Sequence, residues 1–593
     1  MTSYKAPVRD TQFLFEDVFN LYDIYKAFPE AADATPDLVN SILDEAGKFA
    51  EKEVHPINYP GHEEGCRWED GEVFLPKGYE EALEKFHTAG WSQLSENPEY
   101  GGQGLPRALN GAVTEFMTSA SAAFALYASR DGSVAAIERN ASEELKQKYL
   151  PNLIDGRWGG PMSMTEPHCG SDLGLLRTKA EPQADGTYTI TGTKMFITGG
   201  EISIAENSIH LLLARIPGSP EGIKGISLFI VPKFMVNDDG SLGERNSFSC
   251  GSIEHKMGLN ASATCVMNYD GAKGWLISDI NKGMRAMFAM VNKSRFLVGL
   301  QGTGITEAAY QYAVNYALDR TQMRSLTGPK NPDGAADPII VHPDVRRMLL
   351  SQRAFAEGSR ALNTYIGQLF DEEEWSKDSE RKKEVAHLLD LLTPISKGFG
   401  SEMGTENTNL ALQCFGGHGY IRENGVEQFV RDMRITQLYE GTTGIQGLDL
   451  LARKILGTQG EALKTFTKEI NAFCEENATN DALKTFTAPL SELTVQWEEL
   501  SVKAGMAAME KTLDELGSAS VDFLMYSGYV TLAYMWAKMA KASLGKDDSF
   551  YKAKLQTANF YYHRILPRTK AHAEMMLSGA EYLMDMDAEA FLR

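Results

Sequence analysis

The hydrophobic pattern of this chain changes character three times, at about residues 160, 280 and 461, which restricts the folds open to it. Up to about residue 160, apolar side chains recur three and four positions apart, as in LVNSILDEAGKFAEKEV and SEELKQKYLPNLI, a spacing typical of amphipathic helices. From about 161 to 280, short alternating or β-branched runs such as GTYTITGTKMFITGG and SIHLLLARI are separated by Gly, Asn, Asp and Pro. Long helical stretches return after 280. The sequence therefore predicts a mainly α protein with a small antiparallel β domain inserted between helical parts.

The 593 residues are enough for three or four domains with sizeable cores. A polar segment rich in Pro and Gly, SLTGPKNPDGAADP at 325–338, interrupts the second helical part. The changes of pattern divide the chain into an N-terminal helical domain at 1–160 with an extension at 1–34, a middle β domain at 161–280, a C-terminal helical bundle at 281–460 and an extra helical domain at 461–593.

The most apolar run of the chain is FLMYSGYVTLAYMWAKMA at 523–540. A bilayer span needs about 20 predominantly apolar residues, so the length of this run is close to sufficient. Its Ser, Gly and Thr and its three Tyr favour a helix buried in protein instead. We therefore expect no membrane span.

Charge and cysteine usage exclude several classes of partner. The formal net charge of −22 opposes binding to nucleic-acid phosphates and to anionic lipid, because both depend on clustered Lys and Arg. The six cysteines are scattered, with no C-x-x-C and no His at metal-ligand spacing, so we expect no metal site and reduced thiols in the cytoplasm. Charges of both signs interrupt the first apolar residues, which is unlike a signal peptide.

Nucleotide-binding motifs of the common kinds are missing from the sequence. It contains no G-x-x-x-x-G-K-[ST], and no G-x-G-x-x-G that follows a strand and opens a helix. Any bound dinucleotide is therefore expected outside a Rossmann fold.

Glu440 stands in QLYEGTTGIQ, between an aromatic residue and a run of small residues that leads into an apolar segment. Taken alone, it is best explained as an acid before a helix N-terminus, where the helix dipole favours a carboxylate by ~0.3–1 kcal/mol. Thr442 or Thr443 would then cap the helix. The alternative is a base that removes a proton from a substrate.

Other polar and glycine-rich stretches also have ordinary structural explanations. Hydroxyls in the loop after TEP commonly close turns, Phe196 is the kind of residue that fills a β core, and Arg320 would lie on a solvated helix face. The glycines of QCFGGHGY would end a helix or allow close packing.

Three co-linear segments nevertheless carry a resemblance that periodicity does not supply. They are MSMTEPHCGSDLGLLRTKAEP with GTKMFITGG about 30 residues later, then ALDRTQM, then QCFGGHGYIRENGVEQFVRDMRITQLYEGTTGIQ. In order, spacing and helix–β–helix succession, from about 35 to 456, the chain resembles the acyl-CoA dehydrogenase family. The resemblance implies an N-terminal helical domain, a middle antiparallel β domain and a C-terminal four-helix bundle, here with an extra helical domain.

The resemblance also implies FAD as the cofactor. Hydroxyls and main-chain N–H groups of the TEP loop (165–171) and the next strand would hydrogen-bond the isoalloxazine edge, and Phe196 would stack on the ring. Arg320 would meet the pyrophosphate of FAD in a neighbouring subunit, which implies a homo-oligomer, a dimer or a tetramer. The implied cofactor contacts are Thr165, Ser171, Phe196, Thr198, Arg320, Gln322, Gln413, Gly417 and Thr442.

For Glu440, the resemblance implies the catalytic role. The glutamate of Y-E-G-T in this family removes the proton α to the thioester while hydride leaves the β carbon for flavin N5. Its backbone N–H, together with a flavin ribityl hydroxyl, would stabilise the enolate-like thioester oxygen. An electron-transfer flavoprotein is the implied electron acceptor. The implied substrate contacts are Ser171, Arg295, Tyr439 and Gly441.

The segment 325–338, the C-terminal extension and the start YKAPVRD resemble those of extended family members. Among these, the chain most resembles the group that oxidises 3-(methylthio)propanoyl-CoA to 3-(methylthio)acryloyl-CoA in dimethylsulfoniopropionate breakdown. The alternatives are an AidB-like flavin-containing DNA-associated protein and a long-chain acyl-CoA dehydrogenase or oxidase. Residues 461–593 contain 14 Lys and Arg but 19 Asp and Glu, and this negative charge balance disfavours DNA binding.

Overall fold

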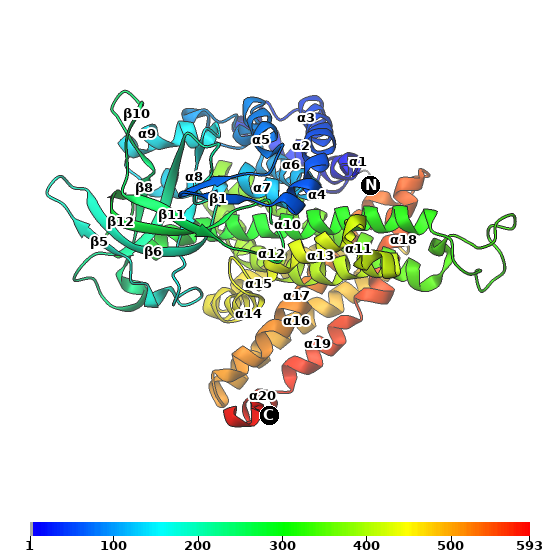
Figure 1. Ribbon diagram of the computed structural model, residues 1–593. Coiled ribbons are helices and arrows are strands. Elements are labelled where there is room, and N and C mark those ends of the chain that lie inside the picture. Colours follow the sequence, from blue (N-terminus) through cyan, green and yellow to red (C-terminus); the bar gives the residue numbers. More distant parts are fainter. Residues whose placement is uncertain (1–3, 593) are drawn as a thin grey trace. The chain divides into compact units, whose positions relative to one another are not determined.

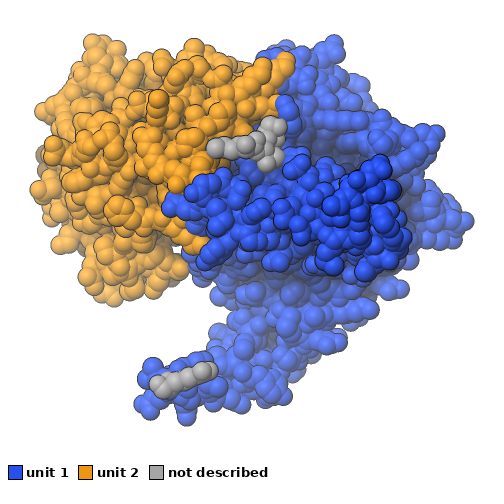
Figure 2. Space-filling model, turned by 45° about the vertical axis from the view of Figure 1, so that its right-hand side comes forward, with its two compact units in different colours: residues 1–47, 106–119, 295–593 blue, residues 48–105, 120–294 orange. Residues whose placement is uncertain are grey.

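The computed structural model describes residues 4–592 (Figure 1). The fold class is the predicted one, helical parts around an inserted β domain. Two compact units divide the chain, and Figure 2 colours them. Unit 1 comprises 1–47, 106–119 and 295–593, and unit 2 comprises 48–105 and 120–294. The predicted division into four domains stays a prediction.

Unit 2 contains short helices and the sheet. A π-helical turn, Ala50–Val54, precedes its first helix. The helices are α4 (His55–Glu64), α5 (Tyr79–Thr88), α7 (Ala122–Ala128), α8 (Asp131–Asn140) and α9 (Glu143–Ile154). The strands are β1 (Arg67–Glu69), β2 (Glu72–Phe74), β3 (Trp158–Gly159), β4 (Met162–Ser163), β5 (Lys179–Pro182), β6 (Tyr188–Thr198), β7 (Asn207–Arg215), β8 (Ile226–Pro232), β9 (Phe234–Val236), β10 (Leu242–Arg245), β11 (Phe248–Ile253) and β12 (Thr264–Leu276).

Five strands of unit 2 pair in a closed ring. β6 pairs with β12, β12 with β8, β8 with β7, β7 with β5, and β5 with β6. Strand β7 is buried at eight consecutive positions and reads NSIHLLLAR, as expected for a strand covered on both faces. Most pairs are antiparallel, as predicted, but β3, β4 and β5 run parallel to β7. Alternation along a strand does not reveal the direction of its partner, so these parallel pairs could not be predicted from the sequence pattern.

Unit 1 is helical. Its helices are α1 (Val8–Phe13), α2 (Leu21–Tyr25), α3 (Pro36–Phe49), α6 (Arg107–Ala120), α11 (Pro343–Trp375), α12 (Ser379–Phe415), α13 (Val426–Arg434), α14 (Thr443–Leu448), α15 (Glu461–Glu476), α16 (Lys484–Glu510), α17 (Asp514–Ser543), α18 (Ser549–Phe560), α19 (Arg568–Leu577) and α20 (Glu581–Met584). The 37-residue α10 (Gly283–Asp319) begins in unit 2 and continues into unit 1.

Helix α12 is central to unit 1 because α11, α13, α14, α15 and α17 all pack on it. Glycines bring α10 close to it: a Cβ at Gly302 would lie 3.0 Å from the carbonyl oxygen of Gly400. The Ser396 hydroxyl donates to Asn363 on α11 at 2.7 Å, and Asn363 donates to Thr303 on α10 at 3.0 Å. Three helices are thus joined both by close packing and by a buried polar chain.

The apolar run at 523–540 forms most of α17, which is buried as expected. Helices α16 and α19 pack along it, side by side in Figure 1. The indole Nε1 of Trp536 donates to the carbonyl of Ala354 on α11 at 3.0 Å. Among residues 4–592, no helix combines the length and the apolarity that crossing a membrane requires.

Helix α17 also supports the segment that follows Glu440. It packs on α14, where a Cβ at Gly447 would lie only 2.5 Å from the carbonyl oxygen of Ser520. A Cβ at Gly398 of α12 would meet Leu524 at 2.6 Å. At Gly447 the neighbour is backbone, so only glycine permits the approach, whereas at Gly398 the Leu524 side chain would have to move. The C-terminal helices thus pack directly on α14 and α12.

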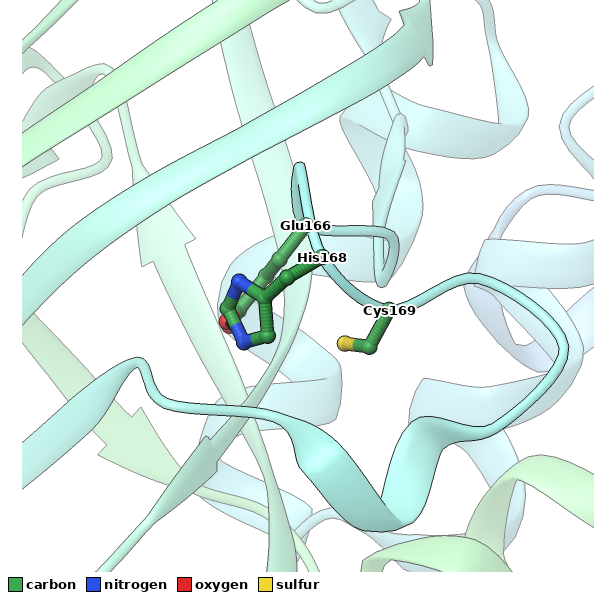
Figure 3. A group of neighbouring side chains, drawn as sticks. All are labelled: Glu166, His168 and Cys169. Atoms are coloured by element: carbon green, nitrogen blue, oxygen red, sulfur yellow. Dashed lines mark ion pairs between the residues drawn. The ribbon is translucent and has the colours of Figure 1, made fainter.

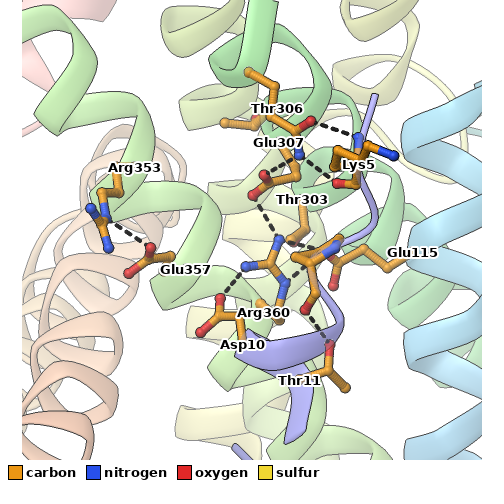
Figure 4. A network of polar contacts seen from close by, with 12 residues as sticks. Lys5, Asp10, Thr11, Glu115, Thr303, Thr306, Glu307, Arg353, Glu357 and Arg360 are labelled. Atoms are coloured by element: carbon orange, nitrogen blue, oxygen red, sulfur yellow. Dashed lines mark hydrogen bonds and ion pairs between the residues drawn. The ribbon is translucent and has the colours of Figure 1, made fainter. Parts of the chain in front are cut away.

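A buried ion network joins distant parts of unit 1 (Figure 4). Arg360 of α11 is 2% exposed and pairs with Asp10 of α1, with Glu115 of α6 at 2.7 Å and with Glu307 of α10 at 2.8 Å. Lys554 of α18 also pairs with Asp10. Two cations and several carboxylates therefore tie the N-terminal extension and the C-terminal helices to the bundle.

Candidate active site

Glu440 lies in the turn between a 3-10 segment, Ile435–Gln437, and α14. Its φ is +54° and that of Gly441 is +90°. The left-handed region costs a non-glycine residue roughly 1–3 kcal/mol, so neighbouring contacts must hold this turn. Thr442 begins α14 as its N-cap, because its hydroxyl accepts the N–H of Ile445 at 3.4 Å. The local prediction of a helix start is therefore correct, and it coexists with an unusual backbone at Glu440.

Buried side chains of unit 1 hold both carbonyls of the turn. The Gln446 side chain, which has no exposed surface, donates to the carbonyl of Glu440 at 3.0 Å and to that of Gly441 at 3.3 Å. Lys397 of α12 also donates to the carbonyl of Gly441. The Tyr439 hydroxyl donates to Gln301 of α10. Within residues 4–592, the N–H of Glu440 donates to no protein acceptor, so it is available to a ligand.

The carboxyl of Glu440 sits in a mixed electrostatic environment. The side chain remains accessible to solvent, yet protein close around it displaces enough water to raise its pKa above the ordinary value. The positive charges of Lys397 and Arg295 counteract part of that rise. A carboxylate with raised basicity that solvent can reach is suited to taking a proton from a weak carbon acid.

Arg295, an implied substrate contact, is engaged with protein in this structure. It is 5% exposed, and its Nη1 lies 2.7 Å from Oδ2 of Asp449, which begins a π-helical segment, Asp449–Ile455. Arg453 pairs with the other oxygen of Asp449 at 2.5 Å. Arg295 is thus held beside the turn by Asp449, and its charge acts on Glu440 from there.

In unit 2, the TEP loop forms a closed turn next to β6. The N–H of Glu166 donates to the carbonyl of Cys169 at 2.9 Å, and the reverse bond measures 3.0 Å. Thr165 is half-buried, and its carbonyl accepts the N–H of Met195 in β6 at 2.9 Å. Ser171 is exposed. Loop and strand are therefore joined, which places Thr165 beside the strand that carries Phe196 and Thr198.

Glu166, His168 and Cys169 lie on this loop with possible ligand atoms within 4.8 Å of one another (Figure 3). A shared metal ion does not suit them, because Glu166 is already neutralised by the buried ammonium of Lys194 at 2.9 Å. The same carboxylate accepts the N–H groups of Arg177 at 2.8 Å and of Thr178 at 3.0 Å. The cluster is better explained as an ion-paired anchor for the loop.

This anchor makes a prediction for stability. Lys194→Met should destabilise the protein by about 3–5 kcal/mol, because Glu166 would remain buried without its cation. Lys273→Met provides a matched control, since Lys273 pairs with Asp185 in the same unit but both side chains are exposed. Urea unfolding should place the Lys273→Met protein within about 0.5 kcal/mol of wild type. Equal losses for the two variants would contradict the assignment of Glu166 and Lys194 as a buried anchor.

Phe196 has an unusual backbone for a bulky residue inside a strand. Its φ is +60°, and its side chain is 56% exposed. The pairing of β12 with β6 shifts register here, because Cys265 pairs with Ile197 whereas Met267 pairs with Lys194. Such a bulge re-aims one side chain out of the alternating pattern. An exposed aromatic held in strained backbone fits a ring that stacks on a flat ligand better than a β core residue.

The residues implied for the pyrophosphate and adenosine of FAD are all exposed in unit 1. Arg320 and Gln322 follow the end of α10, Gln413 lies in the last turn of α12, and Gly417 lies in the 3-10 segment that follows α12, Gly416–Tyr420. A Cβ at Gly417 would meet nothing within 4 Å, which leaves room for another molecule to approach the backbone. The exposed guanidinium of Arg320 is chemically suited to phosphate oxygens. These features fit a dinucleotide contact.

Asp337 organises the segment 325–338 next to these residues. Its carboxylate accepts the N–H groups of Ser325, Lys330 and Asn331 at 2.7–2.9 Å and pairs with Arg324. These bonds hold the pKa of Asp337 down, at about 2. The polar segment is therefore built around one buried acid and returns the chain to α11.

The structure thus brings Tyr439, Glu440, Gly441 and Thr442 together on one turn in unit 1, and Thr165, Phe196 and Thr198 together in unit 2. The sequence interpretation did not identify Lys397, Gln446, Lys194 and Glu166 as partners of these residues. A signal for Lys397 exists, since a lysine within the apolar stretch LLDLLTPISKGFG needs a buried partner. That signal does not name the partner.

Four family models match the chain in sequence order. The N-terminal domain of acyl-CoA dehydrogenase matches 38–157, the middle domain 161–272 and the C-terminal domain 281–456. A model described as acetyl-CoA dehydrogenase C-terminal like matches 466–587.

Individual relatives agree with these matches. A 3-methylmercaptopropionyl-CoA dehydrogenase of Ruegeria pomeroyi is 40% identical over 98% of this chain and 99% of its own. The broad-specificity linear acyl-CoA dehydrogenase FadE5 of Mycobacterium tuberculosis is 33% identical over the whole of both chains. A solved acyl-CoA dehydrogenase of Bacillus anthracis, complexed with FAD, has a TM-score of 0.74 at 22% identity over 93% of this chain and 90% of its own. The chain belongs to the acyl-CoA dehydrogenase family.

Proposed function

We propose that this enzyme dehydrogenates a short acyl-CoA thioester between its α and β carbons, with Glu440 as the base that removes the α proton. The proposed reaction converts 3-(methylthio)propanoyl-CoA into 3-(methylthio)acryloyl-CoA, a step in dimethylsulfoniopropionate breakdown. The observation that carries the assignment of the base is the held left-handed turn at Glu440, with its accessible carboxylate of raised pKa.

The turn offers two groups that the reaction needs on one residue. The carboxylate can accept the α proton, and the N–H of Glu440 can donate to the thioester oxygen as enolate-like charge develops there. Because Gln446 and Lys397 hold the adjoining carbonyls, both groups are oriented before a substrate arrives. Tyr439 and Gly441 flank them, and we propose both as substrate contacts together with Ser171 and Arg295.

FAD is the cofactor of this family, and it supplies the acceptor for the hydride that leaves the β carbon. In unit 2, Thr165, Ser171 and Thr198 would hydrogen-bond the ring and Phe196 would stack on it. In unit 1, Thr442 would contact the flavin, and Arg320, Gln322, Gln413 and Gly417 would hold the pyrophosphate and adenosine. Arg320, Gln413 and Gly417 would do so for the FAD of a neighbouring subunit, in a homo-oligomer that passes electrons to an electron-transfer flavoprotein.

The choice of substrate is supported by similarity along the whole chain. The relative from Ruegeria pomeroyi that is 40% identical carries 3-methylmercaptopropionyl-CoA in its name, and the match covers 98% of this chain. The relative described as broad in specificity is 33% identical. The match includes the C-terminal extension and the segment 325–338. Over its whole length, the chain is therefore more similar to the relative named for the methylthio substrate than to the broad-specificity relative.

Anaerobic bleaching of the flavin tests the substrate. The FAD-loaded enzyme is mixed with 3-(methylthio)propanoyl-CoA, butyryl-CoA and a long-chain acyl-CoA at equal concentrations, and the loss of flavin absorbance is followed. We expect the methylthio substrate to give the highest kcat/KM, with butyryl-CoA second because its chain is similar in length. A preference for the long chain, or equal values across the panel, would overturn the proposed substrate. Release of H₂O₂ in aerobic turnover would indicate an oxidase instead.

A further inference from the structure

Lys397 is a buried cation next to the turn that carries Glu440. It lies on α12 with no exposed surface, 43 positions before Glu440, and its ammonium donates to the carbonyl of Gly441. A buried ammonium is unfavourable unless a negative group and hydrogen-bond acceptors compensate for its lost water. The charged groups and hydrogen-bond acceptors around the Lys397 ammonium therefore indicate its role.

Three charged groups act on the Lys397 ammonium: Glu440, Glu402 and Arg295. Glu402 already accepts hydrogen bonds from Thr443 and from Gln437, the latter at 2.5 Å. Arg295 is paired with Asp449.

Glu440 is thus the carboxylate on which the charge of Lys397 has the clearest effect, and it is the first among the charges that act on the lysine. Burial lowers the pKa of Lys397 to about 8, so the ammonium is mainly protonated at neutral pH.

The hydrogen bond of Lys397 serves the same turn. Glu440 and Gly441 both have positive φ, and their carbonyls are held by Gln446 and Lys397. Ser401, one helical turn along α12, donates to the carbonyl of Thr436 at 3.1 Å, at the start of the segment that leads into the turn. Helix α12 thus fixes the backbone on both sides of Glu440.

We propose that Lys397 is a positioning residue for the dehydrogenation, which fixes the Glu440–Gly441 turn through the carbonyl of Gly441 and places a positive charge beside the Glu440 carboxylate. The charge keeps that carboxylate ionised at lower pH than its desolvation alone would allow. This inference rests on the proposed role of Glu440 as the base.

The first test compares Lys397→Met with Lys397→Arg in the FAD-loaded enzyme. The pH dependence of anaerobic flavin reduction by 3-(methylthio)propanoyl-CoA is measured for each. Lys397→Met should lower the reduction rate by about 10- to 100-fold at pH 7, because the turn loses one of its anchors. It should also move the acid limb of the profile upward by about one pH unit, because Glu440 loses a neighbouring cation.

Lys397→Arg should leave the acid limb near that of wild type, because it keeps the charge, while its rate stays lower since the longer side chain disturbs the bond to Gly441. Lys383→Met is the matched control on the same helix, since Lys383 is exposed, and its profile should equal that of wild type. An acid limb that is unchanged in Lys397→Met, or moved equally in Lys397→Arg, would overturn the inference.

The second test needs neither substrate nor turnover. Urea unfolding is measured for wild type, Lys397→Met, Glu440→Gln and the double variant. If the two side chains interact, the shift in midpoint for the double variant should be smaller than the sum of the single shifts. Additive shifts would overturn the inference.

A third measurement, anaerobic flavin bleaching in Glu440→Gln, separates this inference from the proposed function. If Glu440→Gln still bleaches, Glu440 is not the base, whatever coupling between Lys397 and Glu440 the urea experiment shows. If bleaching is abolished in Glu440→Gln but the acid limb does not move in Lys397→Met, the role of Glu440 as the base is supported and only the proposed role of Lys397 is refuted.

Discussion

Glu440→Gln should retain bound FAD and its yellow colour yet reduce the flavin about 10²- to 10⁴-fold more slowly when acyl-CoA is added without oxygen. The amide has nearly the shape of the carboxylate but cannot take a proton. It also lacks the negative charge that Lys397 and Arg295 face. The measurement is stopped-flow absorbance of the flavin under saturating substrate, so that a weaker binding step does not enter the rate.

Glu461→Gln is the control for this experiment. Glu461 lies exposed in the first turn of α15, where the same substitution removes a surface charge. Its flavin should bleach at the wild-type rate. Bleaching of Glu440→Gln at a similar rate would mean that another group takes the α proton, and the turn at 439–442 would then be structural.

The pH dependence of the wild-type reduction follows from the same carboxyl. Because desolvation raises the pKa of Glu440, the acid limb of the rate profile should lie above the ordinary value for glutamate, about 4.3. The rate should rise with pH through that limb, since only the ionised form accepts the proton.

Arg360→Met is expected to cause the largest loss of stability among single substitutions at the charges of unit 1. It would leave three carboxylates, Asp10, Glu115 and Glu307, without the cation that pairs with all of them. Removing one partner of a buried ion pair costs about 3–5 kcal/mol, and the network here has more than one pair to lose. Urea unfolding at pH 7 is the measurement. Arg347→Met on the same helix breaks only an exposed pair with Asp344 and should change stability by no more than about 1 kcal/mol.

The sign of the pH dependence distinguishes this mechanism from a simple packing defect. Burial already raises the pKa of Glu115 to about 7, despite the opposing effect of Arg360. Without Arg360, the pKa of these buried carboxyls in the folded protein should rise further. Folding should therefore be accompanied by proton uptake up to a higher pH than in wild type. Since the folded variant then binds more protons than the unfolded chain, the loss of stability should grow as pH rises from 6 to 8. A loss independent of pH would point to packing alone.

Local sequence patterns were sufficient to predict the order of helical and β segments, the buried helix at 523–540 and the family. The change of period at 160 and 280 reflects how side chains alternate on helices and strands, which depends on a few neighbouring residues. The run at 523–540 was correctly expected as a buried helix, because its polar residues are unlike those of a membrane span. The motifs around Thr165, Arg320 and Glu440 gave the family, which the matches over 38–587 confirm.

Contacts over long sequence separation were not predictable in this way. Arg360 and Asp10 lie 350 positions apart, and nothing in either local sequence names the other. The left-handed backbone of Phe196 depends on a register shift against β12, about 70 residues away. The pairing of Arg295 with Asp449 likewise brings together two helices, and it could not be read from an arginine in a helical pattern.

By itself, the sequence determined the order of helical and β segments, the family and the identity of Glu440 as the residue to test. Only the tertiary structure decided that Glu440 has a left-handed backbone, that Gln446 and Lys397 hold its turn, and that a buried ammonium stands beside its carboxylate. The physical reason is that side-chain period and capping act within a turn or two of helix. The charge and orientation of a catalytic group are instead set by whatever the fold brings within a few ångströms of it.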